Sequence, residues 1–158
     1  MDITTNTDPK VASVNIIQTL IALPDFLRKS ILQGKLKEFY SMEKQDKHET
    51  ISVVLETLPS INEDRLSTLT RTWMEVLSDL DSEQIVEILR IYCEEIKSDP
   101  EVIQKIHIDS IIRIFYTLED KKKEKLIDCL KEVFLSFPNR YEIINLIPDF
   151  GQRALRIK

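Results

Sequence analysis

Apolar residues recur every three or four positions along most of the chain, the spacing that places them on one face of a helix. This spacing predicts helices over residues 10–23, 24–42, 46–58, 62–79, 82–97, 101–116, 121–137 and 139–158. The last of these contains Pro148 and Gly151, so we expect an interruption there. Residues 1–9 are polar and end in a proline, which predicts a flexible tail before a single α-helical repeat domain over residues 10–158.

The predicted helices repeat with a constant step. The stretch Phe-Tyr-Ser-Met-Glu at residues 39–43 is followed by related stretches at 77–81 and 115–119, a step of 38 residues each time. A step of this length is typical of repeated supersecondary units. The third position holds Ser41, Asp79 or Thr117, residue types that can cap the start of a helix, so we expect a helix break there in every unit. Asp81 with Gln84 also has the spacing of a capping box.

Positions one step apart agree in kind, as in Ile51, Leu89 and Ile127, so every unit presents an apolar face to its neighbours. Over residues 10 to about 152 the pattern resembles HEAT-like α-solenoid repeats, at the level of the fold. The resemblance implies an all-α fold in which antiparallel helix pairs stack as a short solenoid. A compact helical bundle with a coincidental period is the alternative.

Composition supports the all-α class, because the chain has 2 glycines in 158 residues and tight β-hairpin turns depend on glycine. The net charge of -5 disfavours nucleic acid, whose phosphates require a basic face. Two cysteines are too few for a disulfide framework. The apolar run from Val11 to Leu23 is shorter than the roughly 20 residues of a spanning helix, so we expect a cytoplasmic protein without membrane insertion.

The residues offer no catalytic or metal-binding pattern. The glycines, at positions 34 and 151, cannot form a phosphate-binding loop or a nucleophile elbow. The two histidines, His48 and His107, have no second ligand at a metal-binding spacing. We therefore expect no enzyme activity, no cofactor and no metal site.

The remaining candidate surface is aromatic and basic. Tyr40 and Tyr116 each follow a packing position of the repeat and are expected to be half exposed, where aromatic rings favour recognition. Positive charge is unfavourable at a helix start, so a bound partner could compensate for the cluster of Lys121, Lys122, Lys123 and Lys125.

These patterns predict a non-catalytic helical-repeat module for protein–protein interaction, an adaptor or scaffold that binds a protein partner or itself. The first predicted helix is too apolar for a polar cap, and an exposed face on residues 11–23 would predict a dimer or a stable partner. A nucleic-acid-associated HEAT-like module and a ligand-sensing regulatory domain with a cavity between helices are the alternatives.

Overall fold

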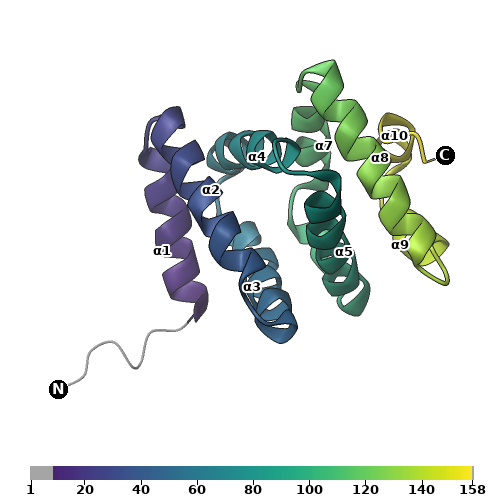
Figure 1. Cartoon of the computed structure of the whole chain (residues 1–158), viewed down its shortest axis with the longest axis horizontal. Helices are drawn as coiled ribbons and strands as arrows, with labels where there is room; N and C mark the ends of the chain where they lie inside the picture. Colours follow the sequence, from purple (N-terminus) through teal and green to yellow (C-terminus); the bar gives the residue numbers. More distant parts are fainter. Residues whose placement is uncertain (1–8, 158) are drawn as a thin grey trace.

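The computed structural model describes residues 9–157, which form helices and no strand (Figure 1). The helices are α1 (Pro9–Ala22), α2 (Asp25–Tyr40), α3 (Lys44–Thr57), the 3-10 helix η1 (Leu58–Ser60), α4 (Glu63–Ser78), α5 (Ser82–Ser98), α6 (Val102–Lys105), α7 (Ile108–Tyr116), α8 (Asp120–Ser136), α9 (Tyr141–Ile144) and α10 (Asp149–Ala154). The all-α class predicted from the sequence is therefore confirmed.

The helices lie in two layers. In one layer α2 packs on α4, α4 on α7 and α7 on α10, and in the other α1 packs on α3, α3 on α5 and α5 on α8. The chain alternates between the layers, so successive helices form antiparallel pairs that stack with the predicted step, and α1 and α10 lie at opposite ends (Figure 1). This is a solenoid-like arrangement in which α1 belongs to the second layer and precedes the first complete pair.

Buried side chains from both layers form one continuous apolar core. Ile85 and Val133 have no exposed surface, and Val76 and Ile88 expose 1% each. Arg28 is a charged exception, buried at the end of the stack that holds α1 and α2.

The predicted helix breaks occur at the expected positions, but their cause differs from the prediction. Ser41, Asp79 and Thr117 follow the last residues of α2, α4 and α7, where they are C-caps and not N-caps. The hydroxyls of Ser41 and Thr117 donate to the carbonyls three residues earlier, each at 2.7 Å. A hydroxyl donor can satisfy a carbonyl at a helix C-terminus as readily as it accepts at an N-terminus, so residue type alone did not decide the role.

The capping box at the start of α5 is confirmed. The Asp81 side chain accepts the Gln84 backbone N–H at 2.9 Å, and the Gln84 side chain accepts the Asp81 backbone N–H at 3.4 Å. The two residues satisfy each other's backbone donors, which fixes the start of this helix.

The segment 101–116 was predicted as one helix and forms two, α6 and α7. His107, between them, has a left-handed backbone with φ 55° and ψ 51°. A residue with left-handed backbone angles ends a helix. Next to the break, Ile103 within α6 and Ile106 at its C-cap are both buried.

The C-terminal segment is interrupted at Pro148, as predicted, because this residue precedes α10. Gly151 lies inside α10 and allows close packing instead of breaking the helix. A Cβ atom there would lie 2.5 Å from Cδ1 of Ile112 and 2.8 Å from Cγ2 of Ile147. At the other end, Pro9 begins α1 and does not belong to the predicted tail, because proline is tolerated in a first turn. The rest of that tail, residues 1–8, lies outside the described residues.

Candidate functional site

Tyr40, predicted as a recognition residue, joins two repeats. Its hydroxyl donates to the backbone carbonyl of Gln84 at 2.9 Å, and its ring lies edge to face against Phe39 with centroids 5.6 Å apart. Burial, followed by the nearby carboxylates of Glu87 and Asp81, raises the pKa of this hydroxyl. These contacts give Tyr40 a role in holding α2 against α5.

Lys125 has a comparable role at the end of α4. Its ammonium group donates to the carbonyl of Ser78 at 3.0 Å and to that of Leu80. A cation at a helix C-terminus stabilises the helix dipole and satisfies carbonyls that lack helical partners. This contact offsets the unfavourable position of Lys125 near the start of α8.

The other predicted residues lie on the surface of α7 and α8. Tyr116 is 53% exposed, Lys121 is exposed, and Lys122 is half-buried. Lys123 pairs with Asp120 at 3.1 Å and lies 6.0 Å from the centre of the Tyr116 ring. Tyr116 and Lys123 line a small polar hollow of about 380 Å³, together with Asp120, Glu124, Arg153 and Arg156 among others.

The reactive side chains are explained by packing. The His48 ring lies between two carboxylates, with Nε2 at 3.1 Å from Glu94 and Nδ1 at 2.9 Å from Glu95, and so joins α3 to α5. Cys93 and Cys129 are free, buried thiols, and burial is the main cause that raises the pKa of Cys93 to about 12. Within residues 9–157, no group of three or more His, Cys, Asp or Glu residues is placed to hold a metal ion.

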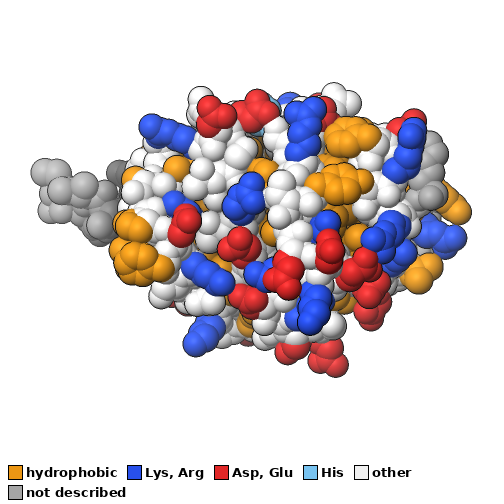
Figure 2. All heavy atoms as spheres, turned by 90° about the horizontal axis from the view of Figure 1, so that it is seen from above, with side chains coloured by type: hydrophobic (Ala, Val, Ile, Leu, Met, Phe, Trp, Pro, Cys, Tyr) orange, Lys and Arg blue, Asp and Glu red, His pale blue; other side chains and the backbone are white. Residues whose placement is uncertain are grey.

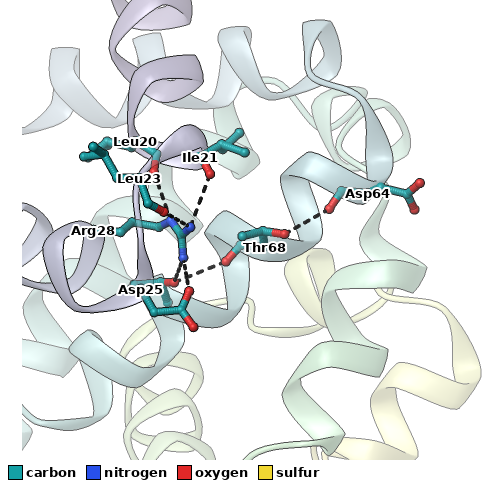
Figure 3. Close-up of polar contacts among 8 residues, drawn as sticks. Leu20, Ile21, Leu23, Asp25, Arg28, Asp64 and Thr68 are labelled. Atoms are coloured by element: carbon teal, nitrogen blue, oxygen red, sulfur yellow. Dashed lines mark hydrogen bonds and ion pairs between the residues drawn. The ribbon is translucent and has the colours of Figure 1, made fainter.

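Arg28 connects α1, α2 and α4 (Figure 3). The guanidinium group donates to the carbonyls of Leu20 at 3.0 Å, Ile21 at 3.2 Å and Leu23 at 2.6 Å, which lie at or just beyond the C-terminal end of α1. It also contacts Asp25 and the hydroxyl of Thr72. One buried cation therefore caps α1 and ties it to both neighbouring helices, which fixes the geometry of this end of the stack.

The end of the stack formed by α1 and α2 exposes apolar side chains on a surface that we call the N-terminal end surface. Figure 2 shows hydrophobic side chains gathered at the end of the molecule that holds α1 in Figure 1. On α2, Phe26 is 72% exposed, Leu27 40% and Ile31 39%. On α1 the exposed stripe is Val11, Asn15, Thr19 and Ala22, and no acid or base occurs from Val11 to Pro24.

A second feature is a half-open apolar cavity of about 950 Å³, lined by residues of both layers, that we call the interlayer cavity. Its walls come from α1 to α5, α7 and α8, and they include the half-buried side chains of Val54, Trp73, Leu89, Tyr92 and Leu130. Val54, Tyr92 and Leu130 lie one repeat step apart, so the cavity follows the direction in which the repeats stack. Apolar walls of this kind favour any apolar molecule that covers them, by about 25 cal/mol per Å².

The sequence raised the possibility of an exposed face on residues 11–23, but it did not mark the α2 residues of the end surface or the residues of the cavity as exposed. Phe26, Leu27 and Ile31 follow the same periodicity as the true core positions Leu32, Leu36 and Phe39 of α2, so the pattern counted them as buried. The apolar character of residues 11–23 is the signal that pointed to this end of the stack. No comparable signal marks the cavity, because its lining residues have the composition of an ordinary core.

Comparison with known protein families, with curated proteins and with solved structures gives no match to this chain. In the part of the chain that the structure describes, no helix is both long and apolar enough to cross a bilayer. A functional proposal therefore depends on the N-terminal end surface and the interlayer cavity.

Proposed function

We propose that this protein is a non-catalytic, HEAT-like helical-repeat module for protein–protein interaction, which acts as a self-associating scaffold. Its first partner is a second copy of the same chain, bound through the N-terminal end surface. The observation that carries the proposal is the exposure of Phe26, Leu27 and Ile31 beside residues 11–22 of α1, which include no acid or base.

A stack of helical repeats needs a polar outer face on its terminal unit to remain apart from other molecules. The N-terminal end does not have a fully polar face, because it exposes Phe26, Leu27 and Ile31. At the opposite end, the exposed Leu135 and Tyr141 are interspersed with several charged residues, among them Glu132, Arg140 and Glu142, whereas Asp25 is the exposed charge next to Phe26 and Leu27 in the sequence. This difference favours the N-terminal end as the surface that another molecule covers.

A second copy fits this surface because the exposed stripe of α1 is neutral. In a two-fold dimer each residue faces the same patch on its partner, so charged patches would meet like charges. Val11, Asn15, Thr19 and Ala22 bring no charge to such a contact. Burying the exposed parts of Phe26 and Leu27 would contribute on the order of 1 kcal/mol per side chain.

A dimer closed at this end leaves the opposite end of both copies open. The exposed Tyr116 and Lys121, which the sequence marks as candidate partner-binding residues, lie on α7 and α8 away from the proposed contact. Two equivalent free surfaces on one closed dimer would suit an adaptor or scaffold that brings two partner molecules together.

Light scattering coupled to size-exclusion chromatography tests the proposal. The wild-type chain is expected to elute as a dimer, and Phe26→Glu combined with Leu27→Glu is expected to elute as a monomer with unchanged helical circular dichroism. Leu135→Glu is the control, since it places a glutamate on an apolar residue of α8 that is 69% exposed, close to the 72% of Phe26, and it should leave the dimer intact. A wild-type monomer at all accessible concentrations, or a dimer lost only with Leu135→Glu, would overturn the proposal.

A further inference from the structure

We propose that the interlayer cavity is a binding site for an uncharged, long-chain aliphatic molecule whose head group carries an ester, amide or hydroxyl oxygen. The site is separate from the N-terminal end surface, and the inference does not depend on self-association.

The size and shape of the cavity suit a chain-like ligand. A volume of about 950 Å³ lies within the range of roughly 300–1,000 Å³ found for small-molecule sites. The lining extends from Ile16 on α1 through Tyr92 on α5 to Leu130 on α8, so the space runs past several successive repeats. An extended aliphatic chain can contact the whole length of such a space, whereas a compact ring system would cover only part of it.

Two side chains supply polar atoms to these apolar walls. Tyr92 and Trp73 line the cavity, and neither the Tyr92 hydroxyl nor the Trp73 indole N–H forms a hydrogen bond with another described residue. No buried side-chain nitrogen or oxygen among residues 9–157 lacks a hydrogen-bond partner, so both groups have accessible surface, which we assign to the cavity. Burial also raises the pKa of Tyr92, which keeps its hydroxyl protonated.

The polar atoms define what the ligand must offer. An indole N–H only donates, and a neutral tyrosine hydroxyl can donate as well. Both groups are therefore satisfied by an acceptor oxygen, such as an ester or amide carbonyl or a hydroxyl. Well-placed polar groups of this kind orient a ligand within an otherwise apolar site.

The charges at the exposed part of the cavity exclude one class of ligand. Glu38, Asp46 and Glu49 are exposed lining residues on α2 and α3, and the single base among the exposed lining, Lys35, lies 3.6 Å from Glu38. Three acids against one base that already has a carboxylate neighbour repel an anionic head group. A fatty acid should therefore bind more weakly than an uncharged molecule of the same chain length.

The single tryptophan of the chain gives a direct measurement, because Trp73 lines the cavity. The probe is N-phenyl-1-naphthylamine, an uncharged apolar fluorophore that accepts excitation energy from tryptophan. We expect saturable binding at one probe per chain with energy transfer from Trp73. Monolauroylglycerol should displace the probe, and laurate should require a clearly higher concentration.

Variants locate the binding site. Val54→Phe should weaken probe binding about tenfold by filling the cavity. Tyr92→Phe removes a hydroxyl without a protein partner, so it should leave probe binding unchanged and weaken monolauroylglycerol about fivefold, the effect of one hydrogen bond. Thermal unfolding monitored by circular dichroism confirms that each variant is folded.

Phe26→Glu with Leu27→Glu separates this site from the N-terminal end surface, and this double variant should bind the probe as wild type does. Loss of binding in the double variant would place the probe on the end surface and overturn the inference. Three other results would also overturn the inference. They are non-saturable probe binding, displacement of the probe by laurate and monolauroylglycerol at equal concentrations, and wild-type probe affinity in folded Val54→Phe. Failure of dimerisation alone would leave these results unchanged and would bear only on the proposed function.

Discussion

Replacing Arg28 with methionine tests whether one buried cation fixes the N-terminal end of the stack. Methionine retains much of the apolar stem of arginine and removes the five hydrogen bonds of the guanidinium group. The Leu20 carbonyl, which receives a buried bond at 3.0 Å, would lose its side-chain donor. The Ile21 and Leu23 carbonyls receive part-buried bonds and could regain water.

The expected loss of unfolding free energy follows from these environments. A hydrogen bond to a charged group contributes about 1.5–3 kcal/mol, and the Leu20 carbonyl is the acceptor that loses a buried one. The Ile21 and Leu23 carbonyls can regain water and so add little, which places the cost of Arg28→Met at about 3 kcal/mol. The ion pair with Asp25 adds little to this, because the Asp25 side chain is 92% exposed and exposed pairs contribute about 0–1 kcal/mol.

Urea denaturation followed by circular dichroism measures the effect. Asp25→Asn is the matched control, because it removes the ion pair and leaves the three carbonyl contacts, and it should cost less than about 1 kcal/mol. If Arg28→Met unfolds within about 1 kcal/mol of wild type, the carbonyl contacts do not stabilise this end of the stack. Equal losses for both variants would instead assign the stabilisation to the ion pair.

Further predictions concern packing, pH and capping, each measured as unfolding free energy in urea. Gly151→Ala should destabilise the protein by about 1–3 kcal/mol through overpacking. Gly34→Ala adds a Cβ with no atom within 4 Å, so it should stabilise the protein by about 0.5–1 kcal/mol. The opposite order of stabilities would contradict the observed packing. Because the pKa of Cys93 is raised to about 12, the folded state holds this proton more tightly. The contribution of this thiol to the unfolding free energy should be fully present below the unfolded thiol pKa of about 8.5 and should then fall by up to about 1.4 kcal/mol per pH unit. Cys93→Ala should therefore reduce the slope of unfolding free energy against pH between about pH 9 and 10, and an unchanged slope would refute this. Lys125→Met should cost about 1–2 kcal/mol by uncapping α4, whereas Lys121→Met, at an exposed site, should stay within about 0.5 kcal/mol; equal effects would argue against the cap.

Periodicity predicted the fold well, because each helix pair buries its apolar face against the neighbouring pairs and repeats that requirement every 38 residues. It failed where a local contact decided the outcome. The left-handed backbone at His107 divides the helix predicted over 101–116. The sequence gives no sign of it, because a histidine and not a glycine occupies this position. Gly151 looked like a helix breaker because the closeness of Ile112 is visible only in three dimensions.

The candidate site was less predictable than the fold. Tyr40 and Lys125 have the residue types of a recognition surface, yet their hydroxyl and ammonium groups bind backbone carbonyls of the neighbouring unit. Phe26 and Tyr92 have the residue types of a core, yet Phe26 is exposed and Tyr92 lines a cavity. Amphipathic spacing shows which face of a helix is apolar, but it cannot show whether a neighbouring helix covers that face.

The distance between spin labels on two copies tests the central claim, association through the N-terminal end surface, most directly. Thr19→Cys places a label on the exposed stripe of α1, and Leu135→Cys places one on α8, while the buried Cys93 and Cys129 should react slowly. We predict strong dipolar coupling between labels at position 19 and weak coupling between labels at position 135. Coupling that is absent at both positions, or strong only at position 135, would contradict the self-associating scaffold.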